Sequence, residues 1–306
     1  MSSNDLRVVV VGLGVQGIKR AHIAGNEVVA TVDQDKNKKA NYINLSNIDT
    51  DTYDAVLLCT PDSIKIDLIK EILNNKKHVL VEKPLFANDI KQIEELQKIA
   101  LNNNLVCYTA YNHRFEPHFI NMKNIIAKND LGKIYRLRMF YGNGTSKLVK
   151  ESKWRDNESG VILDIGSHLI DTLLFWFNEK NIDIKVSNTF NFENSSPDHA
   201  LLSGFIDNIF IELEISLVSW KNDFICDVVG EKGSAHIYSL CKWGPSKLVK
   251  RTRVLPSGRP NEDNKVLIMP DPTWKEEYKY FKNLILNKSL TDLTNDIKII
   301  KILNNR

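Results

Sequence analysis

The chain has 306 residues, of which 42% are hydrophobic and 26% are charged, and its formal net charge is +3. This composition is that of a globular protein long enough for two domains. The small net charge and the lack of a long basic run argue against nucleic-acid binding. The sequence contains no charge-free apolar stretch of about 18 residues, so we expect no membrane span. The N-terminus lacks the pattern of a secretory signal, so we expect a cytoplasmic protein with reduced cysteines. The four cysteines have no metal-like spacing, and we expect no metal site.

The first part of the chain alternates short apolar runs with amphipathic segments. "RVVVV" at residues 7–11 is typical of a strand buried on both faces of a sheet. Further strands are predicted at 27–33, 54–61, 78–84 and 105–111, and helices at 18–24, 64–75 and 89–104. This alternation predicts an N-terminal Rossmann domain with a doubly wound parallel sheet.

The pattern changes after about residue 118, where longer alternating strands begin. Strand-like segments cover 133–143, 183–193, 199–220 and 224–240, the last with a hairpin at "GEKG". Helices are expected at 160–177, 276–287 and 296–305. We therefore predict an α/β fold with a Rossmann domain at 1–118, followed at 119–306 by an α/β substrate domain with a large open, mostly antiparallel sheet.

Three glycines follow the first predicted strand. Gly12, Gly14 and Gly17 form G-x-G-x-x-G between a strand and a helix, the context that a dinucleotide-binding turn requires. There the chain turns tightly, a pyrophosphate can approach the backbone, and the helix N-terminus offers N–H groups. The alternative is a glycine turn without a ligand. We expect the whole turn to bind a cofactor, that is Gly12, Leu13, Gly14, Val15, Gln16 and Gly17.

Asp33 lies at the end of the second predicted strand, 21 residues after Gly12. Its carboxylate would accept hydrogen bonds from the adenosine ribose and would repel a 2′-phosphate. No arginine follows it closely. We therefore expect NAD rather than NADP as the cofactor.

Six segments, in order along the chain, resemble the Gfo/Idh/MocA family of oxidoreductases. They are "GLGVQG", "CTPDSIKIDLI", "VEKPLF", "YNHRFEP", "WRDNESG" and "LDIGSHLID". The Glu-Lys-Pro and D-x-G-x-H-x-x-D motifs are the most specific of these. The resemblance implies NAD(P)-dependent oxidoreduction of a sugar, inositol or nucleotide-sugar. It also implies a homodimer or homotetramer that assembles through the C-terminal sheet.

The resemblance further implies the site residues. Lys83 matches the active-site lysine of the family, and Asp164 and His168 match its remaining catalytic pair. Asn112 and Arg114 match the polar end of a strand. The residues implied to line the cofactor are Thr60, Pro61, Glu82, Lys83, Asn112, Trp154 and Arg155.

The chain departs from the family at several positions. Lys65 stands where the family usually has histidine, and Ser159 where it has a second glycine. Lys65 could alter the cofactor pocket. The stretch between Asp33 and Asp54 is short, which would trim the adenine side of the fold.

Three polar side chains interrupt the strongly apolar segment 160–177. Asp164, His168 and Asp171 are four and three residues apart, so in a helix they share one face, which we expect to line a cleft. A buried ionisable group is costly without a partner or a task. For His168 the alternative is a core histidine bonded to the backbone. Asp171 is left outside the catalytic set, because a bond to a neighbouring side chain explains it equally well.

These residues suit the oxidation of a secondary alcohol, in which a proton leaves the hydroxyl and a hydride leaves its carbon. His168 can accept the proton at neutral pH, Asp164 can orient the ring or hold a hydroxyl, and Lys83 can stabilise the developing alkoxide. Whether His168 or Lys83 accepts the proton stays open at this point.

A basic cluster precedes the apolar segment and consists of Lys147, Lys150, Lys153 and Arg155. It predicts a solvated loop or, alternatively, a clamp for a phosphate or carboxylate of the substrate. Two other functions remain open for the whole chain: glycoside cleavage through transient oxidation, and a non-catalytic NAD-binding regulator. The Lys-Asp-His set favours an enzyme over the regulator, and we expect a small-molecule substrate with no nucleic-acid or membrane partner.

Overall fold

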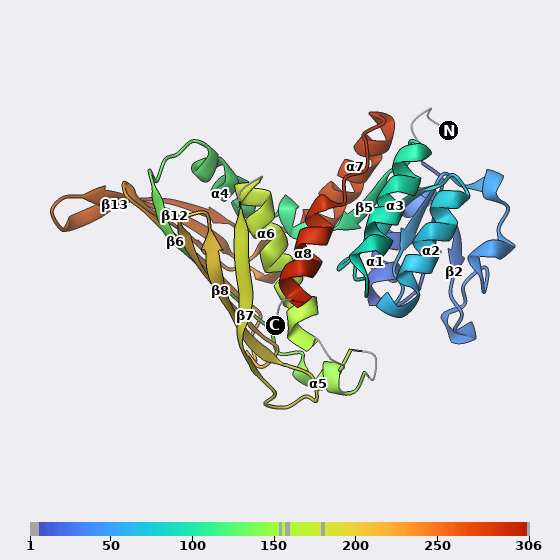
Figure 1. Ribbon diagram of the computed structural model, residues 1–306, viewed down its shortest axis with the longest axis horizontal. Coiled ribbons are helices and arrows are strands. Elements are labelled where there is room, and N and C mark those ends of the chain that lie inside the picture. The colour runs from blue at the N-terminus through green and yellow to red at the C-terminus, as the bar shows by residue number, and fades with distance from the viewer. Residues whose placement is uncertain (1–5, 153–154, 157–159, 179–180, 305–306) are drawn as a thin grey trace. The chain divides into compact units, whose positions relative to one another are not determined.

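The computed structural model describes residues 6–152, 155–156, 160–178 and 181–304 (Figure 1). The chain forms two compact units, Met1–Asn112 with Trp274–Ile300, and His113–Thr273 with Lys301–Arg306. The sequence prediction placed one boundary at residue 118. The units instead divide after Asn112, and most of the last two helices belong to the first unit, because their apolar residues pack in its core.

The first unit contains a five-stranded parallel sheet with the order β2-β1-β3-β4-β5. Its strands are β1 (Val8–Val11), β2 (Val28–Val32), β3 (Ala55–Leu58), β4 (His78–Glu82) and β5 (Cys107–Ala110). Its helices are α1 (Val15–Ala24), α2 (Asp62–Asn74), α3 (Ile90–Asn102), α7 (Thr273–Leu286) and α8 (Thr294–Asn304). The predicted doubly wound parallel sheet is confirmed.

Alternate residues of β1 enter two different cores. Val8 and Val10 pack in a cluster with Phe281 of α7, whereas Val9 and Val11 pack in a second cluster with residues of α2 and α3 such as Ile69. Successive side chains of a strand point to opposite faces, so a run of valines suits a sheet that is covered on both sides. The continuous apolar run therefore suits β1 as an inner strand, which lies between β2 and β3.

The second unit contains an eight-stranded sheet with the order β13-β12-β11-β10-β6-β9-β8-β7. Its strands are β6 (Ile134–Gly142), β7 (Ile182–Phe190), β8 (His199–Ile206), β9 (Ile209–Ser216), β10 (Asp223–Gly230), β11 (Gly233–Tyr238), β12 (Ser246–Val254) and β13 (Gly258–Leu267). Among the described strands of this second sheet, only β6 and β9 pair in parallel. The mostly antiparallel sheet and its "GEKG" hairpin are confirmed.

Three details of this unit differ from the sequence prediction. Residues 199–220 form two strands, because the chain turns at Asp207, which has a positive φ of 51°. The strands β12 and β13 and the helices α4 (Pro117–Ala127) and α5 (Ser146–Lys150) were not predicted. Much of β13 is exposed and polar, so it lacks the apolar alternation that marks a strand.

The helix α4 packs on α6 (Ser167–Phe177), and both cover one face of this sheet. The indole Nε1 of Trp176 in α6 donates to the carbonyl oxygen of Phe119 in α4 at 3.0 Å. The ring of Phe119 lies 5.0 Å from that of Phe224 in β10. The predicted helix at 160–177 is confirmed over most of its length, but it begins with a π-helical turn over Ile162–Gly166.

Candidate functional site

The glycine turn in the first unit joins β1 to α1, and two of its glycines are required by packing. Gly12 has φ +89°, and a Cβ there would lie 2.5 Å from the carbonyl oxygen of Cys59. A Cβ on Gly17 would lie 1.8 Å from the carbonyl oxygen of Gly12. The turn thus brings strand and helix as close as the sequence motif predicts.

The middle glycine has a different surrounding. A Cβ on Gly14 would meet nothing within 4 Å, and Gly14 is the N-cap of α1 without a side-chain capping bond. The next residues, Val15 and Gln16, are exposed, while Leu13 is buried. The first N–H groups of a helix have no partner within the helix. The turn therefore leaves room and donors for a phosphate at this helix terminus.

The neighbouring strand end supplies a further polar group. Because β1 lies between β2 and β3, the direction of strand connections reverses beside it, where α/β sheets bind ligands. At the end of β3, the hydroxyl oxygen of Thr60 is buried and has no hydrogen-bond partner among the described residues. Pro61 follows as the N-cap of α2. This orphaned hydroxyl and the open Gly14 fit a dinucleotide.

Asp33 lies beside the glycine turn and ties the end of β2 to it. One carboxylate oxygen accepts from the backbone N–H of Leu13 at 2.6 Å, and the other accepts from that of Asp35 at 2.8 Å. Each carboxylate oxygen can accept more than one hydrogen bond. The side chain can therefore brace the turn and still accept a hydroxyl donor.

The Glu82-Lys83-Pro84 segment ends β4 and is anchored through buried charges. Glu82 accepts from Arg20 Nε at 2.6 Å, and Arg20 also pairs with Glu277 at 2.6 Å. Arg20 is 1% exposed and Glu277 is fully buried. Burial alone would lower the pKa of Arg20, but the two carboxylates raise it above its usual value, so the guanidinium stays charged. Asn112, after β5, is also buried.

In the second unit, Asp164 and His168 lie on the helical segment, as predicted. Asp164 lies in the π-helical turn, is 40% exposed, and accepts from Arg155 at 3.3 Å. The ring of His168, near the start of α6, stacks on that of His113 with 4.1 Å between centroids and 21° between planes. Arg155, predicted to line the cofactor, therefore pairs with a predicted catalytic carboxylate.

Asp171 has a structural partner. It is fully buried and forms a bidentate ion pair with Arg114, one bond of which is 2.9 Å long. Burial raises the pKa of Asp171, and Arg114 acts in the opposite direction. The explanation by a bond to a neighbouring side chain agrees with this geometry, although the partner comes from the segment after β5 rather than from the same helix.

Three residues near His168 were not assigned a role from the sequence: His113, which stacks on it, and Lys242 and Tyr141 beside His113. Lys242 Nζ lies 3.3 Å from His113 Nε2 and 3.1 Å from the Tyr141 hydroxyl. Desolvation lowers the pKa of Lys242 to about 8, while Asp271, Glu116 and Asp164 act to raise it. His113 lies beside Arg114 in the segment "YNHRFEP", and this position could have indicated it as a candidate site residue. Lys242 lies outside the predicted elements and Tyr141 lies in a predicted strand, and neither residue carried a signal of function.

The basic cluster is only partly described. Lys147 and Lys150 are exposed residues of α5, which fits a solvated surface. Lys153, Trp154 and Ser159 lie outside the described residues. The predicted phosphate clamp therefore stays a prediction, and so does the role of Trp154 beside the cofactor.

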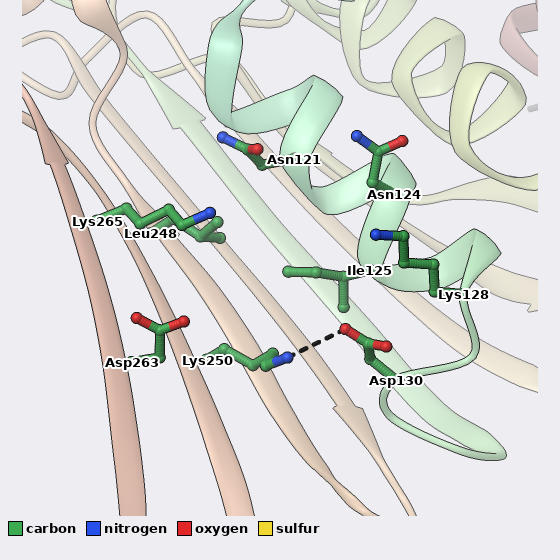
Figure 2. A pocket seen from close by; sticks show the side chains of 9 residues that line it. All are labelled: Asn121, Asn124, Ile125, Lys128, Asp130, Leu248, Lys250, Asp263 and Lys265. Atoms are coloured by element: carbon green, nitrogen blue, oxygen red, sulfur yellow. Dashed lines mark hydrogen bonds and ion pairs between the residues drawn. The ribbon is translucent and has the colours of Figure 1, made fainter.

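A separate hollow of about 260 Å³ lies between α4, β12 and β13. Figure 2 shows three lysines and two aspartates around it, with Lys250 paired to Asp130 at 3.0 Å. None of the described residues that line this hollow belongs to the predicted catalytic or cofactor site. Its opposite charges balance closely, so it presents no strong field to a ligand.

The described residues lack a metal-binding group and a membrane-spanning helix. They contain no group of three or more His, Cys, Asp or Glu side chains arranged to hold a metal ion. None of the described helices combines the length and apolarity needed to cross a bilayer.

Comparison with known proteins matches both parts of the chain to one family. Residues 6–111 match the model of an oxidoreductase family with an NAD-binding Rossmann fold, and residues 119–236 match the GFO/IDH/MocA C-terminal domain. The two matches lie in the same order as the two units.

Individual relatives agree with these matches. Glucose-6-phosphate 3-dehydrogenase of Bacillus subtilis is 24% identical over 265 residues, which is 74% of this chain and 75% of the relative. Inositol 2-dehydrogenase of Rubrobacter xylanophilus is 27% identical and covers 59% of this chain, while the match covers 54% of that protein. Other relatives match over less than half of their own length.

A solved structure shows the same fold over nearly the whole chain. The inositol dehydrogenase homolog of Azotobacter vinelandii, complexed with NADH and myo-inositol, has a TM-score of 0.82 and 18% sequence identity. The match covers 99% of this chain and 94% of that one. At this level of identity, the similarity defines the fold.

Proposed function

Because the chain belongs to the Gfo/Idh/MocA family of oxidoreductases, we propose that it transfers a hydride between a nicotinamide and a secondary alcohol or ketone of a sugar, inositol or nucleotide-sugar. The observation that carries the proposal is the glycine turn beside the orphaned Thr60 hydroxyl, in a chain that also holds the Lys83, Asp164 and His168 set. A regulator would have no use for that set.

The three catalytic candidates have complementary tasks. When bound, the nicotinamide would accept the hydride from the substrate carbon or return it. We propose that His168 takes the hydroxyl proton, and that its stack on His113 holds the ring in one orientation. Asp164 accepts hydrogen bonds from the substrate or orients the imidazole. Lys83 donates to the reacting oxygen and stabilises the negative charge that develops there.

We propose NAD over NADP as the cofactor. Asp33 supports this choice, because its fixed carboxylate would repel a 2′-phosphate and accept bonds from a ribose 2′-hydroxyl. Glu82, Asn112, Arg155 and Trp154 remain proposed as residues near the cofactor. We further propose a cytoplasmic homo-oligomer that assembles through the sheet of the second unit, which light scattering of the purified protein would test.

The test follows reduced nicotinamide at 340 nm with NAD⁺ or NADP⁺ and a panel of sugars, inositols, sugar phosphates and nucleotide-sugars. We expect turnover with NAD⁺ for at least one class. Lys83→Ala and His168→Ala should each lower kcat by about 10²- to 10⁴-fold, the usual contribution of a positioned acid–base group. Lys70→Ala, an exposed lysine of α2, is the control and should leave kcat unchanged. Full activity in Lys83→Ala or His168→Ala would refute the mechanism.

A further inference from the structure

Lys65 is a buried lysine that the proposed chemistry does not use. It lies in the first turn of α2, and its side chain is 2% exposed. A cation is disfavoured at a helix N-terminus, and burying an ammonium costs several kcal/mol after relaxation, about as much as a strong ion pair returns. A residue kept in such a place needs partners that repay this cost.

The Lys65 ammonium has one partner for each of its three N–H donors. It donates to Asp62 Oδ1 at 2.5 Å, to the carbonyl oxygen of Glu82 at 2.9 Å, and to the carbonyl oxygen of Pro84 at 2.9 Å. An ammonium has three donors and no acceptor, so its capacity is fully used. No other single side chain of ordinary size supplies three donors from one atom.

These partners enclose Lys83. The two carbonyls belong to the residues immediately before and after it, so the ammonium holds the peptide unit that precedes Lys83 and the one that follows Pro84. The Glu82 side chain is held independently by Arg20. Pro84 and Leu85 are buried as well. The backbone around Lys83 is therefore anchored from two directions, by Arg20 through a side chain and by Lys65 through the main chain.

We propose that Lys65 is a positioning residue for the reaction: by binding the carbonyl oxygens of Glu82 and Pro84, it sets the direction in which the Lys83 side chain leaves β4. This inference rests on the proposed function, because it gives Lys83 a task that depends on its position. Misplacing a reacting group by about 1 Å can lower the rate by about 10²-fold. Lys65 need not contact substrate or cofactor to have this effect.

A double-mutant cycle tests the proposal with the full-length protein, NAD⁺ and the best substrate of the panel. Lys65→Met should lower kcat by about 10- to 100-fold while the dissociation constant of NADH changes less than about threefold. In a Lys83→Ala background, Lys65→Met should have no further effect beyond about twofold, because both changes remove the same contribution. Lys65→Arg, which keeps the charge and donors, should restore part of kcat. Lys70→Met is the matched control on the same helix.

Two outcomes of the cycle would overturn the proposal. One is a kcat in Lys65→Met equal to that of the wild type. The other is an equal fold-loss from Lys65→Met with and without Lys83, which would mean that Lys65 acts independently of it. Should Lys65→Met fail to fold, Lys65→Gln, which keeps two donors on one nitrogen, takes its place, and the same outcomes decide.

A readout that needs no turnover separates this proposal from the proposed function. Amide hydrogen exchange of peptides that cover Glu82–Ala87 should accelerate by about tenfold or more in Lys65→Met and stay unchanged in Lys70→Met. Unchanged exchange in Lys65→Met would refute the role of Lys65 even in an active enzyme. Accelerated exchange in a protein that turns over no substrate would refute the proposed function and leave the anchoring of this loop established.

Discussion

The two units hold their ionisable side chains in different ways. In the first unit, Arg20 lies between two carboxylates, and Lys65 has an acceptor for each donor. The two carboxylates raise the pKa of Arg20 above its usual value, so this guanidinium keeps its charge. In the second unit, His113 and His168 stack on each other, and Lys242 beside them has a pKa of about 8. These examples of the first unit are paired charges, whereas the second unit contains a buried ammonium whose pKa desolvation has lowered toward neutral pH.

This difference matches two separate requirements of proton and hydride transfer. A cofactor and a loop must be held in one geometry at every working pH. Buried ion pairs can do this where both partners stay charged at those pH values. An acid–base group must change its protonation state, so its surroundings must let the proton move. One ion pair of the second unit, between Arg114 and Asp171, follows the first pattern and serves to anchor a helix.

The largest expected effect is the loss of the central charge in the first unit. Arg20→Met would leave Glu82 and Glu277 buried without a cation, and breaking a buried pair in this way costs about 3–5 kcal/mol. Urea denaturation followed by circular dichroism measures the free energy of unfolding. A further change of Glu277 to Gln should recover part of the loss.

The matched control is Arg7→Met, which removes an arginine that pairs with Asp54 at the surface, where the side chains are 46% and 35% exposed. Exposed pairs contribute little to stability because water and salt screen them, so this variant should unfold almost as the wild type does. Equal losses in the two variants would show that a buried ion pair of the first unit is no more important for stability than an exposed one.

The sequence predicted the parts of the fold that follow from local pattern. The valine run of β1 and the spacing of its glycines required nothing beyond the identity of neighbouring residues. The parallel class of the first sheet and the mostly antiparallel class of the second followed from the same periodicity, whereas the strand orders did not. The strands β12 and β13 were missed, because polar and charged residues fill most of their positions and the edge of a sheet does not require apolar alternation.

Contacts between distant segments could not be predicted. Lys65 was noted only as a departure from a family pattern, since its partners lie 17 and 19 residues away. Lys242 is more than 100 residues from both His113 and Tyr141. Such pairs form when strands and helices pack, and one sequence alone contains no record of them. For the same reason, the partner of Asp171 was left open.

A smaller effect should appear in the pH dependence of stability. Desolvation lowers the pKa of Lys242 from 10.5 to about 8, so between these values the unfolded chain holds a proton that the folded chain has released. Stability from this group therefore rises with pH from about 8 to about 10.5 and is constant below. The difference in unfolding free energy between wild type and Lys242→Met should change by at most about 3 kcal/mol across this range, at about 1.36 kcal/mol per pKa unit.

Comparing wild type with Lys242→Met at each pH removes the contribution of other titrating groups. Lys247→Met, a change in the same region of the chain at a residue of β12, is the control for the loss of a lysine side chain. A pH-independent difference for Lys242→Met would mean that its ammonium is hydrated in the folded chain. The contrast between the two units would then rest on the ring stack of His113 and His168 alone.

The smallest expected effect concerns whether a fixed carboxylate of the first unit also selects the cofactor. Asp33→Asn keeps an acceptor for the N–H of Leu13 but removes the charge. A hydrogen bond to a charged group contributes about 1.5–3 kcal/mol, so NADH should bind about tenfold more weakly, and the preference over NADPH should narrow. Fluorescence titration with both cofactors measures this. Asp35→Asn, the neighbouring carboxylate that caps Asn37, is the control, and an equal effect there would assign cofactor choice to general surface charge rather than to Asp33.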